Sequence, residues 1–108
     1  MAIKLAGEQF KSAFVARLGG DEFVILIERT RDCASLPTLA RTVLRELRHT
    51  VVDGAVRCTV SATVGGAVSE DATAAQQTLH EADIALYAAK RTQRGTGRIF
   101  GRPETIER

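Results

Sequence analysis

Two adjacent glycines and two adjacent carboxylates, directly before an unbroken apolar run, constrain the fold of this chain more than any other feature. The glycines are Gly19 and Gly20, the carboxylates are Asp21 and Glu22, and the run of strand-forming residues covers 23–27. Such a run is typical of a strand buried on both faces. A glycine pair permits the left-handed backbone of a tight turn. We therefore expect residues 15–18 and 23–27 to form a hairpin with an acidic tip.

The chemistry of this tip has two interpretations. Asp21 and Glu22 would stand side by side, and because neighbouring carboxylates repel each other, a divalent cation is a natural partner for them. The alternative is a solvated β-turn, since glycine and aspartate are ordinary turn residues. On chemistry alone both interpretations stay open.

Size and composition favour one small soluble domain. The chain has 108 residues, 44% of them hydrophobic and 26% charged. It contains neither a long apolar run nor a secretory signal pattern, so we expect no membrane span and a cytoplasmic location. The formal net charge of +2 is too small to indicate nucleic-acid binding. Cys33 and Cys58 lack the spacing of metal ligands, and we expect both to be buried or half-buried small apolar residues.

Hydrophobic periodicity predicts three helices. Residues 2–14 show helical spacing of their apolar positions. Residues 36–47 have the clearest amphipathic pattern, with Ser35 as N-cap and Pro37 in the first turn. The basic residues of this segment fall largely on the other face, which we interpret as solvated. Residues 74–93 form the third predicted helix, rich in alanines that permit close packing on a sheet.

The remaining patterns predict strands and a tail. Residues 51–52 indicate a short strand, followed by an Asp-Gly turn. A longer strand should run over residues 56–64, where alternating apolar positions place one face in the core. Residues 98–100 suggest a last short strand, and 102–108 a polar tail.

Three motifs in order resemble one known family. Residues 17–23 and the apolar run behind them look like the signature hairpin of the GGDEF family, the diguanylate cyclases, and the pentapeptide 19–23 stands letter for letter. Residues 60–67 are similar to a family strand that ends in a Ser-Ile-Gly-type turn, with Thr63 where serine is usual. Residues 82–90 are close to the helix motif Ala-Asp-x-Ala-Leu-Tyr-x-Ala-Lys. The resemblance covers residues 3–100.

The resemblance implies an α+β fold with helices packed on an antiparallel-rich sheet, in a domain over residues 1–101 and a tail over 102–108. The family domain is longer at its N-terminus, where a first helix, a central strand with a metal-binding Asp, and Asn and Asp residues that read guanine are found. No stretch here matches these parts. Without the central strand, residues 23–27 would present an unpaired apolar edge. We therefore expect this strand either to pair directly with the 56–64 strand or to be completed by another copy, in a homo-oligomer.

The resemblance also implies site residues. Diguanylate cyclases join two GTP molecules into cyclic di-GMP, with two domains facing each other so that each 3′-hydroxyl attacks the other's α-phosphate. By this resemblance Gly19 and Gly20 lie against the nucleotide, and Asp21 binds Mg²⁺ while Glu22 assists at the metal or with the proton.

Lys90 matches the family lysine that contacts the terminal phosphates, and Arg94 the arginine that follows it, although Gln93 and Gly95 replace the usual Gly and Asn around it. One helical turn apart, the two would form a phosphate clamp on one helix face. The alternative is a pair of solvated basic residues near a helix C-terminus.

These observations predict a GGDEF-type domain of bacterial cyclic di-GMP signalling, a nucleotidyltransferase by family, with GTP as partner and Mg²⁺ as cofactor. Because a metal ligand and the base-reading groups are missing, we expect little or no turnover from this chain alone. The alternatives are a catalytically dead GTP-binding or protein-interaction module and a shortened gene product without activity. The family's Arg-x-x-Asp inhibitory site is replaced by Phe10 and Ala13, so product inhibition through it is not expected.

Overall fold

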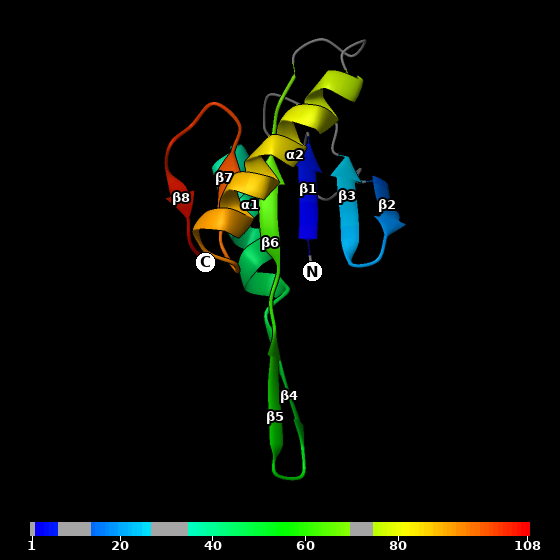
Figure 1. The fold of residues 1–108 in the computed structure, drawn as a ribbon, viewed down its shortest axis with the longest axis vertical. Helices are drawn as coiled ribbons and strands as arrows, with labels where there is room; N and C mark the ends of the chain where they lie inside the picture. The colour runs from blue at the N-terminus through cyan, green and yellow to red at the C-terminus, as the bar shows by residue number, and fades with distance from the viewer. Residues whose placement is uncertain (1, 7–13, 27–34, 70–74) are drawn as a thin grey trace.

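The computed structural model describes residues 2–6, 14–26, 35–69 and 75–108, and the structural statements below concern these residues (Figure 1). Two helices and eight strands are found in them. In chain order they are β1 (Ala2–Ala6), β2 (Phe14–Gly19), β3 (Glu22–Leu26), α1 (Leu36–Glu46), β4 (His49–Asp53), β5 (Val56–Val60), β6 (Thr63–Gly66), α2 (Ala75–Thr92), β7 (Gly97–Ile99) and β8 (Thr105–Ile106).

Six of these strands form one mixed sheet in the order β2-β3-β1-β6-β7-β8. The centre is parallel, because β1 pairs in parallel with both β3 and β6, and β6 pairs in parallel with β7. Antiparallel pairs lie at the two edges, β2 with β3 and β7 with β8, and in the separate β4–β5 hairpin. The predicted α+β fold is confirmed. The antiparallel pairing expected of the sheet is restricted to its edges.

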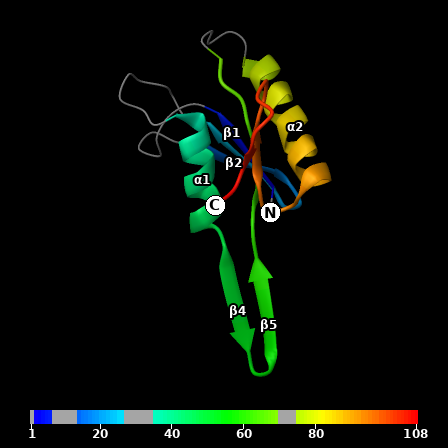
Figure 2. The same ribbon diagram turned by 90° about the vertical axis from the view of Figure 1, so that its left-hand side faces the viewer.

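The two helices cover opposite faces of the sheet, as Figure 2 shows. Neighbouring residues of a strand point to opposite faces. A Cβ atom built on Gly65 would collide with α2, whereas one built on Gly66 would meet Leu36 of α1. The main core lies on the α1 side, where Ile3, Val64 and several other buried residues pack together. The predicted burial of the 23–27 strand on both faces is confirmed at Val24 and Ile25, which are both buried.

Helix α1 forms as the sequence predicts. The Ser35 hydroxyl accepts a hydrogen bond from the Thr38 backbone N–H at 3.4 Å, and a proline stands in the first turn. The apolar stripe is buried against the sheet, and consists of Leu39, Ala40, Val43 and Leu44. Neither helix of the described residues has the length and apolarity that a membrane crossing requires.

The helix expected over residues 2–14 is wrong where the structure describes it, because Ala2–Ala6 is a strand; residues 7–13 lie outside the described part. The expectation that the central strand is missing is also wrong. Strand β1 lies between β3 and β6, in register with both. The apolar residues of β1 fit the spacing of a helix or of a strand. Hydrogen bonding to β3 on one side and to β6 on the other outweighs the weak helical preference of so short a segment. Direct pairing of β3 with β6 is therefore not observed, and the absence of a first helix stays a prediction.

The single long strand predicted over residues 56–64 is in fact two strands with different partners. Val56–Val60 (β5) pairs with β4, and Thr63–Gly66 (β6) enters the main sheet. The β4–β5 hairpin extends away from the sheet and helices (Figure 1), and every residue of both strands is exposed. The core face predicted for this stretch is therefore confined to Ala62 and β6, and Cys58 is exposed rather than buried. Cys33 lies outside the described residues.

The segment expected to be a polar tail adds strand β8 to the edge of the sheet. Thr105 pairs with Arg98, and Ile106 is buried in the main core. The Arg41 Nε atom donates to the Glu107 backbone carbonyl at 3.2 Å, which ties the segment to α1. Residues 102–108 are therefore packed against the domain instead of extending from it.

Candidate functional site

The hairpin tip is a tight glycine turn between β2 and β3. Gly19 and Gly20 have positive φ angles of 141° and 55°, which glycine adopts without a steric penalty. The guanidinium of Arg17 donates through Nε and Nη2 to the Gly20 carbonyl at 3.0 and 2.8 Å. These two hydrogen bonds tie the Arg17 side chain across the turn to Gly20. The predicted hairpin is thus confirmed, with Asp21 at the tip and Glu22 as the first residue of β3.

The topology brings the C-terminal end of α2 to the same edge of the sheet as the hairpin tip. Because β3, β1 and β6 run in parallel, their first residues are level: Ala2 pairs with both Glu22 and Thr63. Helix α2 follows β6 and returns along the sheet, so it ends near the start of β6. The Gly95 N–H donates to the Thr63 Oγ1 at 2.9 Å, and the Val64 N–H to the Thr96 carbonyl at 3.0 Å. The Thr63 hydroxyl thereby fixes the turn after α2.

A cavity of about 340 Å³ lies between these elements, and we call it the first cavity. It is lined by Asp21, Thr59, Val60, Ser61, Thr63, Lys90 and Arg94. A carboxylate from the hairpin tip therefore shares one cavity with an ammonium and a guanidinium from the end of α2. Its volume is that of a small-molecule site.

The structure does not place the two residues of the predicted phosphate clamp on one helix face. Helix α2 ends at Thr92, and Arg94 lies in the turn behind it, before Gly95 with its φ of 85°. Lys90 and Arg94 nevertheless line the same cavity, because the turn leads the chain back toward Thr63. Lys90 is half-buried and Arg94 is exposed, so a ligand could reach both.

Glu22, Gly19 and Gly20 are not among the residues that line the first cavity. Where a Cβ would stand on either glycine, no atom of the other described residues, apart from the two chain neighbours, lies within 4 Å. The turn is therefore accessible from outside, as a ligand that lies against its backbone requires. The hydroxyls of Ser61 and Thr63 were not predicted as site residues, and the motif around Thr63 was the sequence signal that could have indicated them.

The first cavity offers few ligands for a metal ion. Among the described residues no group of three or more His, Cys, Asp or Glu side chains lies together. Of the residues that the structure describes, Asp21 alone brings a carboxylate to its lining, and strand β1 carries no acidic residue. Mg²⁺ is commonly held by one or two carboxylates together with water and substrate phosphates. The donor set therefore fits a Mg²⁺ ion that arrives with a nucleotide, bound by Asp21 with Glu22 beside it, but not a cage made of protein alone.

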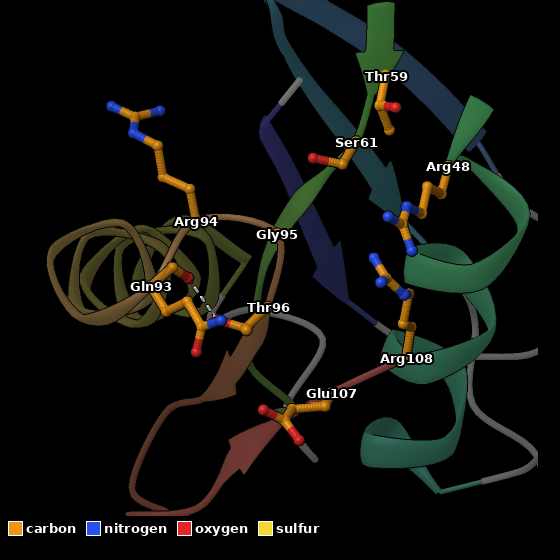
Figure 3. A pocket seen from close by; sticks show the side chains of 9 residues that line it. All are labelled: Arg48, Thr59, Ser61, Gln93, Arg94, Gly95, Thr96, Glu107 and Arg108. Atoms are coloured by element: carbon orange, nitrogen blue, oxygen red, sulfur yellow. Dashed lines mark hydrogen bonds between the residues drawn. The ribbon is translucent and has the colours of Figure 1, made fainter. Parts of the chain in front are cut away.

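A second cavity of about 350 Å³ adjoins the first and shares Thr59, Ser61 and Arg94 with it (Figure 3). Its other lining residues are Arg48, Gln93, Gly95, Thr96, Glu107 and Arg108. Neither Asp21 nor Lys90 reaches it.

A family profile described as "Diguanylate cyclase, GGDEF domain" matches residues 2–96. The chain belongs to the GGDEF family. The resemblance found in the three motifs is thus confirmed, and the matched part contains the hairpin tip, Lys90 and Arg94. No solved structure matches the chain.

Several curated proteins are similar to this GGDEF chain. Diguanylate cyclase TpbB of Pseudomonas aeruginosa is 35% identical over 102 residues, covering 92% of this chain and 23% of that protein. Signaling protein YkoW of Bacillus subtilis is 30% identical over 109 residues, covering 89% and 13%. Cyclic di-GMP phosphodiesterase PdeR of Escherichia coli is 36% identical over 95 residues, covering 87% and 14%. The chain spans less than a quarter of the length of these relatives.

The structure does not describe the positions that correspond to the family's Arg-x-x-Asp inhibitory site. Phe10 and Ala13, which stand at its positions, lie outside the described residues. The expectation that product inhibition through this site is lost therefore rests on the sequence alone.

Proposed function

We propose that this chain is a GTP-binding GGDEF domain of cyclic di-GMP signalling, acting in the cytoplasm, with weak or no cyclase turnover by itself. The observation that carries the proposal is the first cavity, in which Asp21, Lys90 and Arg94 meet although the hairpin and α2 are far apart in the sequence. Relatives named as a diguanylate cyclase and as a cyclic di-GMP phosphodiesterase support the signalling context.

Each residue has a role in this proposal. Lys90 and Arg94 bind the terminal phosphates of GTP, Lys90 as a point charge and Arg94 through its guanidinium fork. Asp21, assisted by Glu22, holds Mg²⁺ against the same phosphates, where the ion neutralises phosphate charge. Gly19 and Gly20 let the nucleotide approach the turn backbone, since nothing occupies the space above them.

In cyclase chemistry a 3′-oxygen bonds to the α-phosphorus of a second GTP, whose bond to the β-phosphate breaks to release pyrophosphate. Two such transfers require two nucleotides held face to face, so turnover needs a homodimer. The β1 strand of this chain brings no carboxylate to the centre of the sheet. Losing one metal ligand and the groups that position the base typically costs orders of magnitude in rate. We therefore expect binding without efficient turnover.

A catalytically dead binding or protein-interaction module is the second candidate. It is favoured by the presence of only one carboxylate among the described residues that line the first cavity. It is also favoured by the exposed β4–β5 hairpin, whose valines include Val51, Val52 and Val56. A sizeable apolar surface of this kind is typical of an interaction site.

Isothermal titration with GTP, in the presence and absence of Mg²⁺, tests nucleotide binding. We expect binding that Mg²⁺ strengthens and that the Lys90→Gln variant weakens by about tenfold, which corresponds to one lost charge-assisted phosphate contact. Arg91→Gln is the matched control, because Arg91 is exposed and lies over the Tyr87 ring instead of lining the cavity. Absence of GTP binding, or equal loss in both variants, would refute the proposal.

Incubation with GTP and Mg²⁺, followed by chromatography for cyclic di-GMP, tests turnover. We expect GTP to remain intact over hours at a protein concentration that saturates binding. Clear formation of cyclic di-GMP would show that another carboxylate replaces the missing ligand, and would favour an active cyclase over the binding module. An Asp21→Asn variant should lose the Mg²⁺-dependent part of GTP binding, whereas Asp53→Asn on the distant hairpin should keep it.

A further inference from the structure

The second cavity has an unusual excess of positive charge. Three arginines and one glutamate line it, and the arginines come from three separate segments: Arg48 follows α1, Arg94 follows α2, and Arg108 follows β8. The net formal charge of the chain is only +2, so this concentration at one cavity is not a property of the whole surface. A cavity with cationic walls attracts small anions and raises their local concentration.

Two of the arginines face each other. In Figure 3 the Arg48 and Arg108 side chains point toward one another into the cavity, while the Glu107 side chain points away from them. Neither guanidinium makes a hydrogen bond or an ion pair with any part of the chain that the structure describes. Two like charges directed at a shared space repel each other, and an anion between them removes this cost.

The position of Arg108 follows from the fold. Ile106, two residues earlier, is buried in the core, and the Arg41 Nε atom donates to the Glu107 carbonyl at 3.2 Å. Arg48 directly follows Leu47, which packs against the same core. Both side chains are therefore carried on backbone that is anchored to the core, so both start from fixed positions beside the same cavity.

We propose that the second cavity is an anion site that binds a phosphoryl group between Arg48 and Arg108. A guanidinium presents parallel N–H donors that match the oxygens of phosphate, and two forks can share one tetrahedral group. Ser61 and Thr96 line the same space. The volume of about 350 Å³ suits a small phosphorylated molecule or pyrophosphate. This site adjoins the proposed nucleotide site and shares Arg94 with it, but Asp21 and Lys90 do not line it.

Calorimetric titration with pyrophosphate in Mg²⁺-free buffer tests this inference. Because the first cavity is also basic, the titrations are made in a Lys90→Gln background. We expect Arg48→Gln and Arg108→Gln each to weaken pyrophosphate binding by at least about tenfold. Arg45→Gln is the matched control: it removes the same charge from an exposed position near the end of α1, but Arg45 does not line the cavity.

Equal affinity of the Arg48→Gln and Arg45→Gln variants would overturn the proposal, as would absence of pyrophosphate binding in the Lys90→Gln background. Matching circular dichroism melting curves show that the variants are folded, as expected for substitutions at exposed positions.

Titration with GTP identifies the source of the phosphoryl group. If Arg48→Gln weakens GTP binding as well, the site accepts nucleotide phosphates; if it weakens pyrophosphate alone, the site binds the free anion. If only the Lys90→Gln variant loses GTP–Mg²⁺ binding, the result concerns the nucleotide site in the first cavity and leaves the anion site untouched. The two proposals can therefore be refuted independently.

Discussion

Among the glycines that the structure describes, Gly65 is the one where an added methyl group should destabilise the fold most. A Cβ atom there would stand 2.3 Å from the Leu86 backbone nitrogen and 2.4 Å from the Ala82 carbonyl oxygen. Ordinary contacts begin at about 3.4 Å, so α2 would have to move by roughly 1 Å from the sheet. Backbone atoms cannot rotate out of the way as side chains can. We therefore expect Gly65→Ala to cost about 3 kcal/mol or more, at the upper end of overpacking penalties.

Urea or thermal unfolding measures this cost. A loss of about 3 kcal/mol should lower the Tm by roughly 12 °C or more in a domain of this size. Gly66→Ala is the matched control, because its Cβ would meet the flexible ends of the Ile99 and Leu36 side chains at 2.8 and 3.2 Å. We expect about 1 kcal/mol there. A Gly65→Ala variant no less stable than Gly66→Ala would refute the close packing of α2 on β6, and with it the position of Lys90.

Three further changes test other parts of the fold. Ile106→Ala should destabilise the domain by about 2 kcal/mol in urea unfolding, because Ile106 is buried, whereas Ile84→Ala on the exposed face of α2 should cost far less. Equal effects would contradict the packing of β8. Ser35→Ala should cost about 0.5–1 kcal/mol and reduce helical circular dichroism, since it removes the α1 N-cap; no change would argue against the cap. Arg17→Met should increase amide hydrogen exchange in the hairpin turn, because the fork on Gly20 is lost; unchanged exchange would show that the turn holds without it.

The local elements were predictable where one pattern dominated. The hairpin at Gly19 and Gly20 followed from glycines that a positive φ requires, and α1 followed from its amphipathic stripe and Ser35 cap. Both signals act within a few residues of one another. The motif at the end of α2 likewise indicated Lys90 and Arg94 as candidate site residues, although it suggested one helix face instead of a helix and a turn.

Prediction failed where long-range pairing decided the outcome. The apolar residues of 2–6 fit the spacing of a helix and of a strand alike. They form a strand because hydrogen-bonding partners, β3 and β6, lie on both sides of them. The 56–64 stretch looked like one strand, yet its first half pairs only with β4 and stays exposed. The tail seemed polar, but the single apolar residue Ile106 is enough to add it to the core.

The sequence by itself determined the family, the acidic glycine turn and the residue types of the candidate site, because these depend on motifs of adjacent residues. Tertiary structure alone decided that Asp21 and Lys90 share a cavity, since this depends on three parallel strands being level and on α2 returning along them. It also brought Arg48 to face Arg108 across the second cavity. No local sequence pattern brings together residues so far apart in the chain. The burial of Ile106 and the register of the sheet bring them together.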